Sequence, residues 1–188
     1  MTILPDSISM QDTKLLADFE RTHRQVIEGI DACLSAKLIT PALMLIYAEI
    51  DVFAWIAATK SEKSVRTRFE SWVRDWLLLK HPIGCTPTDL YAARCGILHS
   101  LAFDSDLTHG RHARKILYAW GNADADELRA KMKAHGKSDC VIHINDLFAT
   151  LCEGIASFLD RAEADPTIRK RVHESARLQM AWLDCVPR

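Results

Sequence analysis

The segment Leu90–Ser100 places a permanent positive charge on the apolar side of a predicted helix. At about 100° per residue, Arg94 falls between Leu98 and Leu101 on the helical wheel. The same apolar arc also contains Leu90, Tyr91, Ala93 and Ile97. Arginine stays protonated at any physiological pH, so its burial without a carboxylate or phosphate partner costs several kcal/mol. Either the fold brings an acid to Arg94 or a ligand supplies one.

Two acids of the apolar run Pro41–Ala58 are candidates for that partner. The run is long enough to be taken for a membrane span, but Glu49 and Asp51 lie near its middle. We therefore predict a buried core helix. An ion pair between Arg94 and either acid is a sufficient structural explanation of the charge. The same acid would also orient Arg94 for a chemical role.

Small residues form a strip beside Arg94 on the predicted helix: Ala92, Ala93, Gly96 and Ser100. A glycine inside a helix loses about 1 kcal/mol relative to alanine, so Gly96 suits a surface that another helix approaches closely. We predict a packed seam here, within the chain or between two subunits. His99 lies at the margin of the apolar arc, and one interpretation is a hydrogen-bonded histidine of that interface.

Composition limits the classes of protein to which the chain can belong. Its 188 residues suffice for one well-packed domain, predicted over 1–188. With 48% apolar and 26% charged residues, it has the composition of a soluble globular protein. The net charge of -1 argues against a dedicated binder of duplex DNA. Six cysteines are scattered without paired spacing and no signal peptide opens the chain, so we expect a reducing, cytoplasmic location and no membrane association.

The hydrophobic periodicity predicts a mainly α fold, an antiparallel helical bundle with a small two-stranded β insert. Three helix starts combine a polar cap with a following proline, at Thr40, Thr86 and Asp165. The predicted helices cover about 11–37, 41–59, 62–80, the segment from 87 that contains Arg94, 145–163 and 165–183. The insert, 104–144, is predicted to hold strands at 115–120 and 140–144 and a short helix at 124–135, ended by Gly136.

The string Tyr91-Ala-Ala-Arg94-Cys-Gly-Ile-Leu-His99 resembles the signature of the HEPN superfamily, an arginine and a histidine separated by four to six residues in an all-α domain. The resemblance covers about 11–103 and the closing helices, but not the insert. Many members are metal-independent endoribonucleases that work as dimers, in which two motif helices form a composite site. The resemblance therefore implies a homodimer with Arg94 and His99 as the catalytic pair. The residue after the arginine is often polar in active members and is Cys95 here.

The two residue types suit RNA cleavage by the 2′-hydroxyl group, which needs no metal or cofactor. Histidine titrates near neutral pH and can act as base or acid, and arginine grips phosphate oxygens. One His99 cannot easily make both proton transfers, so a second copy would complete the site. We predict orienting or supporting roles for Glu49, Asp51, Cys95 and Ser100. The alternatives are a non-catalytic module that binds a nucleotide, RNA or a partner such as an antitoxin, and a purely structural helical dimer.

Other candidate sites are weaker. The basic cluster Arg111, Arg114 and Lys115 is a candidate for RNA-backbone contacts, although charge runs usually cover solvated faces. Two further matches to the arginine–histidine spacing, Arg74 with His81 and Arg129 with His135, lack the apolar context.

Histidine and cysteine pairs are the only hint of a metal site in the sequence. Cys140 and His143 are three residues apart on a predicted strand, so they point to opposite faces, and we predict no zinc site. His23, on the apolar side of the first helix, is predicted to be a hydrogen-bonded core histidine.

Overall fold

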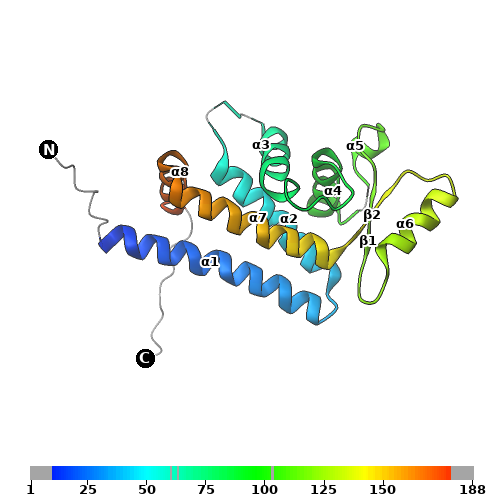
Figure 1. Cartoon of the computed structure of the whole chain (residues 1–188), viewed down its shortest axis with the longest axis horizontal. Helices are drawn as coiled ribbons and strands as arrows, with labels where there is room; N and C mark the ends of the chain where they lie inside the picture. The colour runs from blue at the N-terminus through cyan, green and yellow to red at the C-terminus, as the bar shows by residue number, and fades with distance from the viewer. Residues whose placement is uncertain (1–9, 60, 63, 103, 179–188) are drawn as a thin grey trace.

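The computed structural model describes residues 10–59, 61–62, 64–102 and 104–178. Helices dominate it and two short strands form one sheet, which confirms the predicted mainly α fold with a small β insert (Figure 1). The elements are α1 (Met10–Ser35), α2 (Ile39–Ala57), α3 (Val65–Trp72), the π-helical turn η1 (Val73–Leu77), α4 (Pro87–Ser100), α5 (Asp106–His109), β1 (Ile116–Ala119), α6 (Ala125–Ala134), β2 (Cys140–His143), α7 (Ile144–Ala164) and α8 (Pro166–Ala176).

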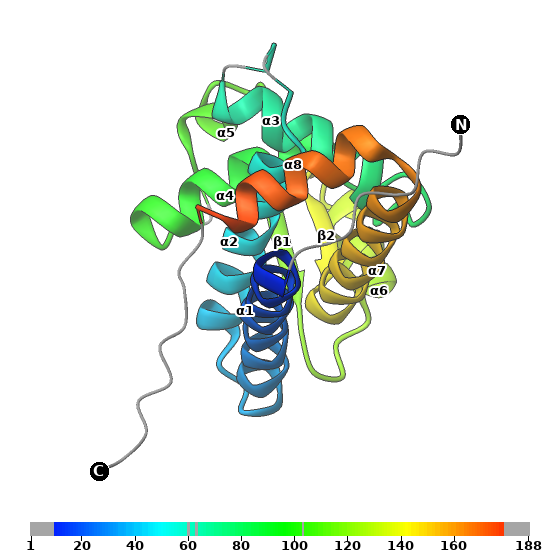
Figure 2. The same ribbon diagram turned by 90° about the vertical axis from the view of Figure 1, so that its left-hand side faces the viewer.

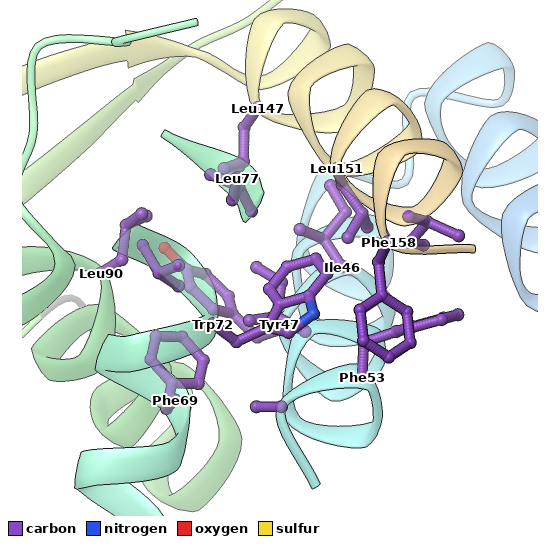
Figure 3. Close-up of a cluster of buried hydrophobic side chains, with 14 of the residues drawn as sticks. Ile46, Tyr47, Phe53, Phe69, Trp72, Leu77, Leu90, Leu147, Leu151 and Phe158 are labelled. Carbon is purple, nitrogen blue, oxygen red and sulfur yellow. The ribbon is translucent and has the colours of Figure 1, made fainter. Parts of the chain in front are cut away.

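Helix α2 is the centre of the bundle. By length and composition it is apolar enough to cross a membrane, and half of that stretch is buried within the protein. It packs against α1, α3, α4, α7 and α8. Tyr47 and Phe53 from α2 meet Trp72 and Phe158 in the core, where a ring of α7 lies edge-on to Phe53 (Figure 3). Neighbouring helices therefore cover about half of the apolar run that the sequence predicts to be buried, while Met44 and Trp55 are exposed.

Two helices begin at residues other than those predicted. Helix α2 begins at Ile39 after Leu38, which makes no side-chain cap, so Thr40 lies inside the helix. Helix α7 begins at Ile144, so the capping residue is His143 and not Asn145. The imidazole of His143 accepts a hydrogen bond from the backbone amide of Asn145. The starts at Thr86 and Asp165 are as predicted.

The helix predicted over 62–80 is shorter in the structure and changes from α-helical to π-helical winding after Trp72. It begins at Val65, where the hydroxyl of Ser64 accepts the amide of Thr67. After Trp72 the chain forms η1, in which the amide of Leu78 donates to the carbonyl of Val73. Helix α7 approaches this turn closely at Gly154, where a Cβ atom would lie 3.2 Å from the carbonyl oxygen of Trp76.

The insert forms a β-α-β unit at one end of the molecule (Figure 1). Strands β1 and β2 are parallel, with Ile116 opposite Cys140 and Ala119 opposite His143. Two parallel strands need a crossover connection, and α6 provides it. At the other end α8 lies across α1, α2 and α7 (Figure 2). The last helix is predicted to reach residue 183, whereas α8 ends at Ala176. Residues 179–183 lie outside the described part of the chain.

Candidate functional site

Helix α4 carries the candidate site, and its start is fixed by a complete capping box. The hydroxyl of Thr86 accepts the amide of Asp89, the carboxylate of Asp89 accepts the amide of Thr86, and Pro87 opens the helix. Asp89 is 2% exposed, and it also accepts hydrogen bonds from the backbone amide and the guanidinium of Arg114. Burial would raise the pKa of this carboxyl, but those hydrogen bonds hold it below its ordinary value.

Arg94 lies at the edge of the buried face of α4, not at its centre. The buried face contains Leu90, Ala93 and Ile97, and Arg94 is half-buried beside it. The prediction placed Leu101 on the same face, but the helix ends at Ser100. Leu101 follows with a φ of 53° and is largely exposed. The helical wheel gives the wrong position for Leu101 because this residue lies beyond the end of the helix.

Asp51 is the acid that pairs with Arg94. One carboxylate oxygen, Oδ2, lies 2.7 Å from Nε and 2.6 Å from Nη2 of the guanidinium. The exposed fractions of the two side chains are 15% for Arg94 and 22% for Asp51. Burial alone would lower the pKa of Arg94, but the hydrogen bonds and charge of Asp51 raise it above its ordinary value. The ion pair therefore joins α2 to α4 and fixes the direction of the guanidinium.

His99 meets the free end of the same guanidinium. Its Nε2 lies 3.0 Å from Nη1 of Arg94, and the imidazole is exposed. Because a guanidinium carries only donors, Nε2 accepts this bond, and the ring proton then lies on Nδ1. Asp51, Arg94 and His99 thus form a continuous chain of contacts that runs from the half-buried ion pair to the exposed imidazole.

Glu49, the other predicted partner of Arg94, pairs with His23 instead. Its Oε1 lies 2.6 Å from Nδ1 of His23, and both side chains are buried. The rings of Phe19 and Phe53 lie on the imidazole, at centroid distances of 4.4 and 4.8 Å. His23 is therefore a hydrogen-bonded core histidine, as predicted, and Glu49 joins α1 to α2.

Cys95 and Ser100, the other predicted supporting residues, have different surroundings. Cys95 is half-buried next to Arg94 and Tyr91. Burial and then the neighbouring Cys95 raise the pKa of Tyr91. Ser100 donates its hydroxyl hydrogen to the carbonyl of Gly96, one turn earlier in its own helix. Only Cys95 therefore borders the Asp51–Arg94–His99 cluster.

Gly96 of α4 faces the chain's own backbone, which corrects the helix–helix seam predicted at this glycine. A Cβ atom there would lie 2.6 Å from the carbonyl oxygen of Ala102 and 2.7 Å from that of Asp104. The amide of Ala102 donates to the carbonyl of Gly96, so the segment after α4 folds back onto the helix. The glycine is needed because backbone, not a second helix, occupies the space of a side chain.

The basic cluster of the insert lines a cleft of about 670 Å³, but two of its three members are already paired. Arg114 binds Asp89 through Nε and Nη2, and Nζ of Lys115 lies 3.0 Å from Asp104. Arg111 is exposed. The pairing of Arg114 with Asp89 holds the insert against α4, and the predicted RNA-backbone role of the cluster stays a prediction.

A polar cluster that was not predicted from the sequence lies around Asp89. The hydroxyl groups of Tyr47 and Tyr118 lie 2.5 Å apart, and burial raises the pKa of both. Burial also raises the pKa of Cys85 and of Cys140 to about 12, and Cys140 donates to Asp89. The only sequence signal for this cluster is the capping position of Asp89. That position does not indicate that the other carboxylate oxygen, Oδ1, accepts the backbone amide of Arg114.

No group of three histidine, cysteine or acidic side chains suited to a metal occurs in the described part of the chain. Cys140 points toward Asp89, whereas His143 caps α7 and bonds the carbonyl of Gly121. Neither further arginine–histidine match forms a cluster like that on α4: Arg74 pairs with Asp75 and His81 with Glu153.

Comparisons with known proteins leave the Arg94–His99 geometry as the principal evidence on function. No family model, no curated protein and no solved structure matches this chain. The resemblance to the HEPN superfamily therefore stays a prediction from the spacing of these two residues.

Proposed function

We propose that the chain is a metal-independent endoribonuclease, related in mechanism to HEPN proteins, with its reaction centre at Arg94 and His99. The observation that supports this most directly is the 3.0 Å contact between Nη1 of Arg94 and Nε2 of the exposed His99. A cation that binds phosphate and a group that exchanges protons thus meet at one surface position. Asp51 holds the guanidinium in place and acts as a positioning residue.

In the proposed reaction, the RNA phosphate takes the place of His99 at Nη1 of Arg94. The imidazole accepts the proton of the 2′-hydroxyl group through Nε2 as the 2′-oxygen attacks phosphorus. The bond from phosphorus to the 5′-oxygen breaks, and an acid protonates the leaving oxygen. The products are a 2′,3′-cyclic phosphate and a 5′-hydroxyl end. Arg94 stabilises the negative charge that grows on the phosphate oxygens during attack.

A second copy of the chain would supply the acid. A single His99 that has just accepted a proton faces the attacking oxygen, while the leaving oxygen departs from the opposite side of phosphorus. In a twofold dimer with both α4 helices at the interface, the partner's imidazolium can lie on that side. We therefore propose a homodimer in which the two copies share one reaction centre.

A structural role is the competing function, and the ion pair favours it. Nε and Nη2 of Arg94 both bind Oδ2 of Asp51, a contact that would join α2 to α4 without any substrate. A module that binds RNA or a nucleotide without cleaving it would use the same two residues. The three functions differ in what His99→Ala and Arg94→Ala change.

The test is cleavage of mixed RNA by purified protein in EDTA, with His99→Ala and a control variant, His135→Ala. His135 is also exposed and follows an arginine, but it lies at the end of α6. We expect cleavage that leaves cyclic phosphates and falls by about 100-fold or more in His99→Ala only. RNA with 2′-deoxy residues should resist cleavage. Retained RNA affinity without cleavage would identify the binding module, and a loss of stability in Arg94→Ala without either activity would identify the structural role.

A further inference from the structure

A second cavity, separate from the Arg94–His99 cluster, lies where the end of α2 meets α3, α7 and α8. Its volume is about 220 Å³. Its apolar wall includes Ala54, Trp76, Phe158 and Ile168, and Trp72 and Arg171 also line it. The volume is below the roughly 300–1,000 Å³ of sites for drug-sized ligands, so only a small molecule fits.

Two N–H groups at this cavity have no acceptor among the described residues. They are the indole Nε1 of Trp72, a side chain that is 2% exposed, and Nε of Arg171. The close-up of the core shows the indole nitrogen on the side of the ring toward Phe53 and Phe158 (Figure 3). Buried donors are almost always paired in folded proteins, so two unpaired donors at one cavity require an explanation.

The two acids that line the cavity, Glu62 and Asp75, already accept hydrogen bonds from other donors. Glu62 accepts from the amide and hydroxyl of Thr59. Burial would raise the pKa of Glu62, but its hydrogen bonds and the charge of Arg171 lower it. Asp75 accepts from Arg74, and the carbonyl of Ala57 accepts from Nη1 of Arg171. Neither Nε1 of Trp72 nor Nε of Arg171 donates to these acceptors, so both donors stay available to a ligand.

We propose that this cavity binds a small carboxylic acid with an aliphatic or aromatic body. Its two carboxylate oxygens would accept from Nε1 of Trp72 and Nε of Arg171, because a guanidinium edge binds carboxylates strongly. The apolar body would lie against Phe158 and Ile168. This site is independent of the proposed RNA cleavage, since none of its residues belongs to the Arg94–His99 cluster.

Benzoate and hexanoate are suitable probes, with inorganic phosphate and chloride as comparisons. Indole N–H signals are followed by ¹H–¹⁵N NMR on the full chain, and the Trp72 signal is assigned from its loss in Trp72→Phe. We expect a saturable shift of this signal with at least one carboxylate. Arg171→Gln should weaken binding by about tenfold or more, because it removes a charge-assisted hydrogen bond.

Lys170→Gln is the matched control, because Lys170 is exposed on the same helix and pairs with Glu174. We expect its affinity to stay within about twofold of the parent chain. Arg171→Lys keeps the charge without Nε and tests the donor if Arg171→Gln unfolds. The proposal is wrong if the Trp72 signal does not move with either carboxylate, if phosphate or chloride shifts it equally, or if both variants of Arg171 bind like Lys170→Gln.

Discussion

At the scale of a residue, Gly96 shows that a helix can require glycine for more than one reason. The sequence predicts a neighbouring helix, whereas the structure places the carbonyl oxygens of Ala102 and Asp104 where a Cβ would lie. These are backbone atoms of a tight return, so they cannot rotate away as a flexible side chain could. We predict that Gly96→Ala lowers the free energy of unfolding by about 1–3 kcal/mol, although alanine favours helix.

Gly29→Ala is the control for this measurement. In α1 the added methyl group would meet only the side chain of Leu45, at 3.7 Å. Urea denaturation should show that this variant is equal to the parent chain or more stable by up to about 1 kcal/mol. Equal effects of Gly96→Ala and Gly29→Ala would contradict the close approach after α4.

Asp89 should make stability depend on pH in the acid range. Its folded pKa is lowered, so the unfolded chain binds more protons below the ordinary carboxyl value of about 3.9. The stabilisation is therefore complete above that value and is lost as the pH falls toward the folded pKa. Asp89→Asn should cost about 2–3 kcal/mol at pH 7, because Arg114 and the cap lose a charged acceptor.

The measurement is urea denaturation between pH 3 and pH 7. The parent chain should lose stability below about pH 4 more steeply than Asp89→Asn does, so the two curves converge. Parallel curves over this range would show that Asp89 does not carry the dependence.

At the scale of the element, α2 shows how much of the candidate site is readable from sequence. Glu49 and Asp51 are two positions apart, so they lie about 200° apart around the helix and cannot both face α4. The pattern makes either acid a candidate partner of Arg94, but the choice between them depends on which side of α2 the helix α1 occupies. The structure places α1 on the side of Glu49, and His23 of α1 is hydrogen-bonded to Glu49 in the core.

Secondary structure is likewise predictable where neighbouring residues decide it and not where distant contacts do. The start of α4 was predictable because Thr86, Pro87 and Asp89 act locally. The π-helical turn was not, because it fits the close approach of Gly154 from α7, a contact with no local signal. The two strands were visible as apolar runs, but their parallel pairing depends on the path of α6.

The His23–Glu49 pair leads to a prediction on the packing of α1 against α2. Glu49→Leu removes the acceptor at 2.6 Å from the imidazole and should cost about 1–3 kcal/mol, because a buried hydrogen bond loses its acceptor. The double variant with His23→Leu should regain most of this loss. A double-mutant cycle by urea denaturation measures the coupling, and strictly additive losses would show that the two side chains do not act as a pair.

At the scale of the whole molecule, the proposed reaction needs two chains because each has one His99 beside its Arg94. The surface at the end of α4 must then face a partner, and Leu101, 62% exposed, lies two residues beyond His99. We predict that Leu101→Asp separates the dimer and abolishes RNA cleavage. Aspartate tolerates the left-handed conformation of this position, so the fold should persist.

Leu79→Asp is the matched control, since Leu79 is 71% exposed and lies just after η1, outside the α4 surface. Sedimentation and cleavage are measured at the same protein concentrations. We expect Leu79→Asp to remain dimeric and active, and Leu101→Asp to sediment as a monomer. A monomeric variant that still cleaves RNA would show that one chain holds the complete reaction centre, and a dimeric but inactive one would place the interface elsewhere. Only joint loss of dimer and cleavage agrees with a centre shared across α4.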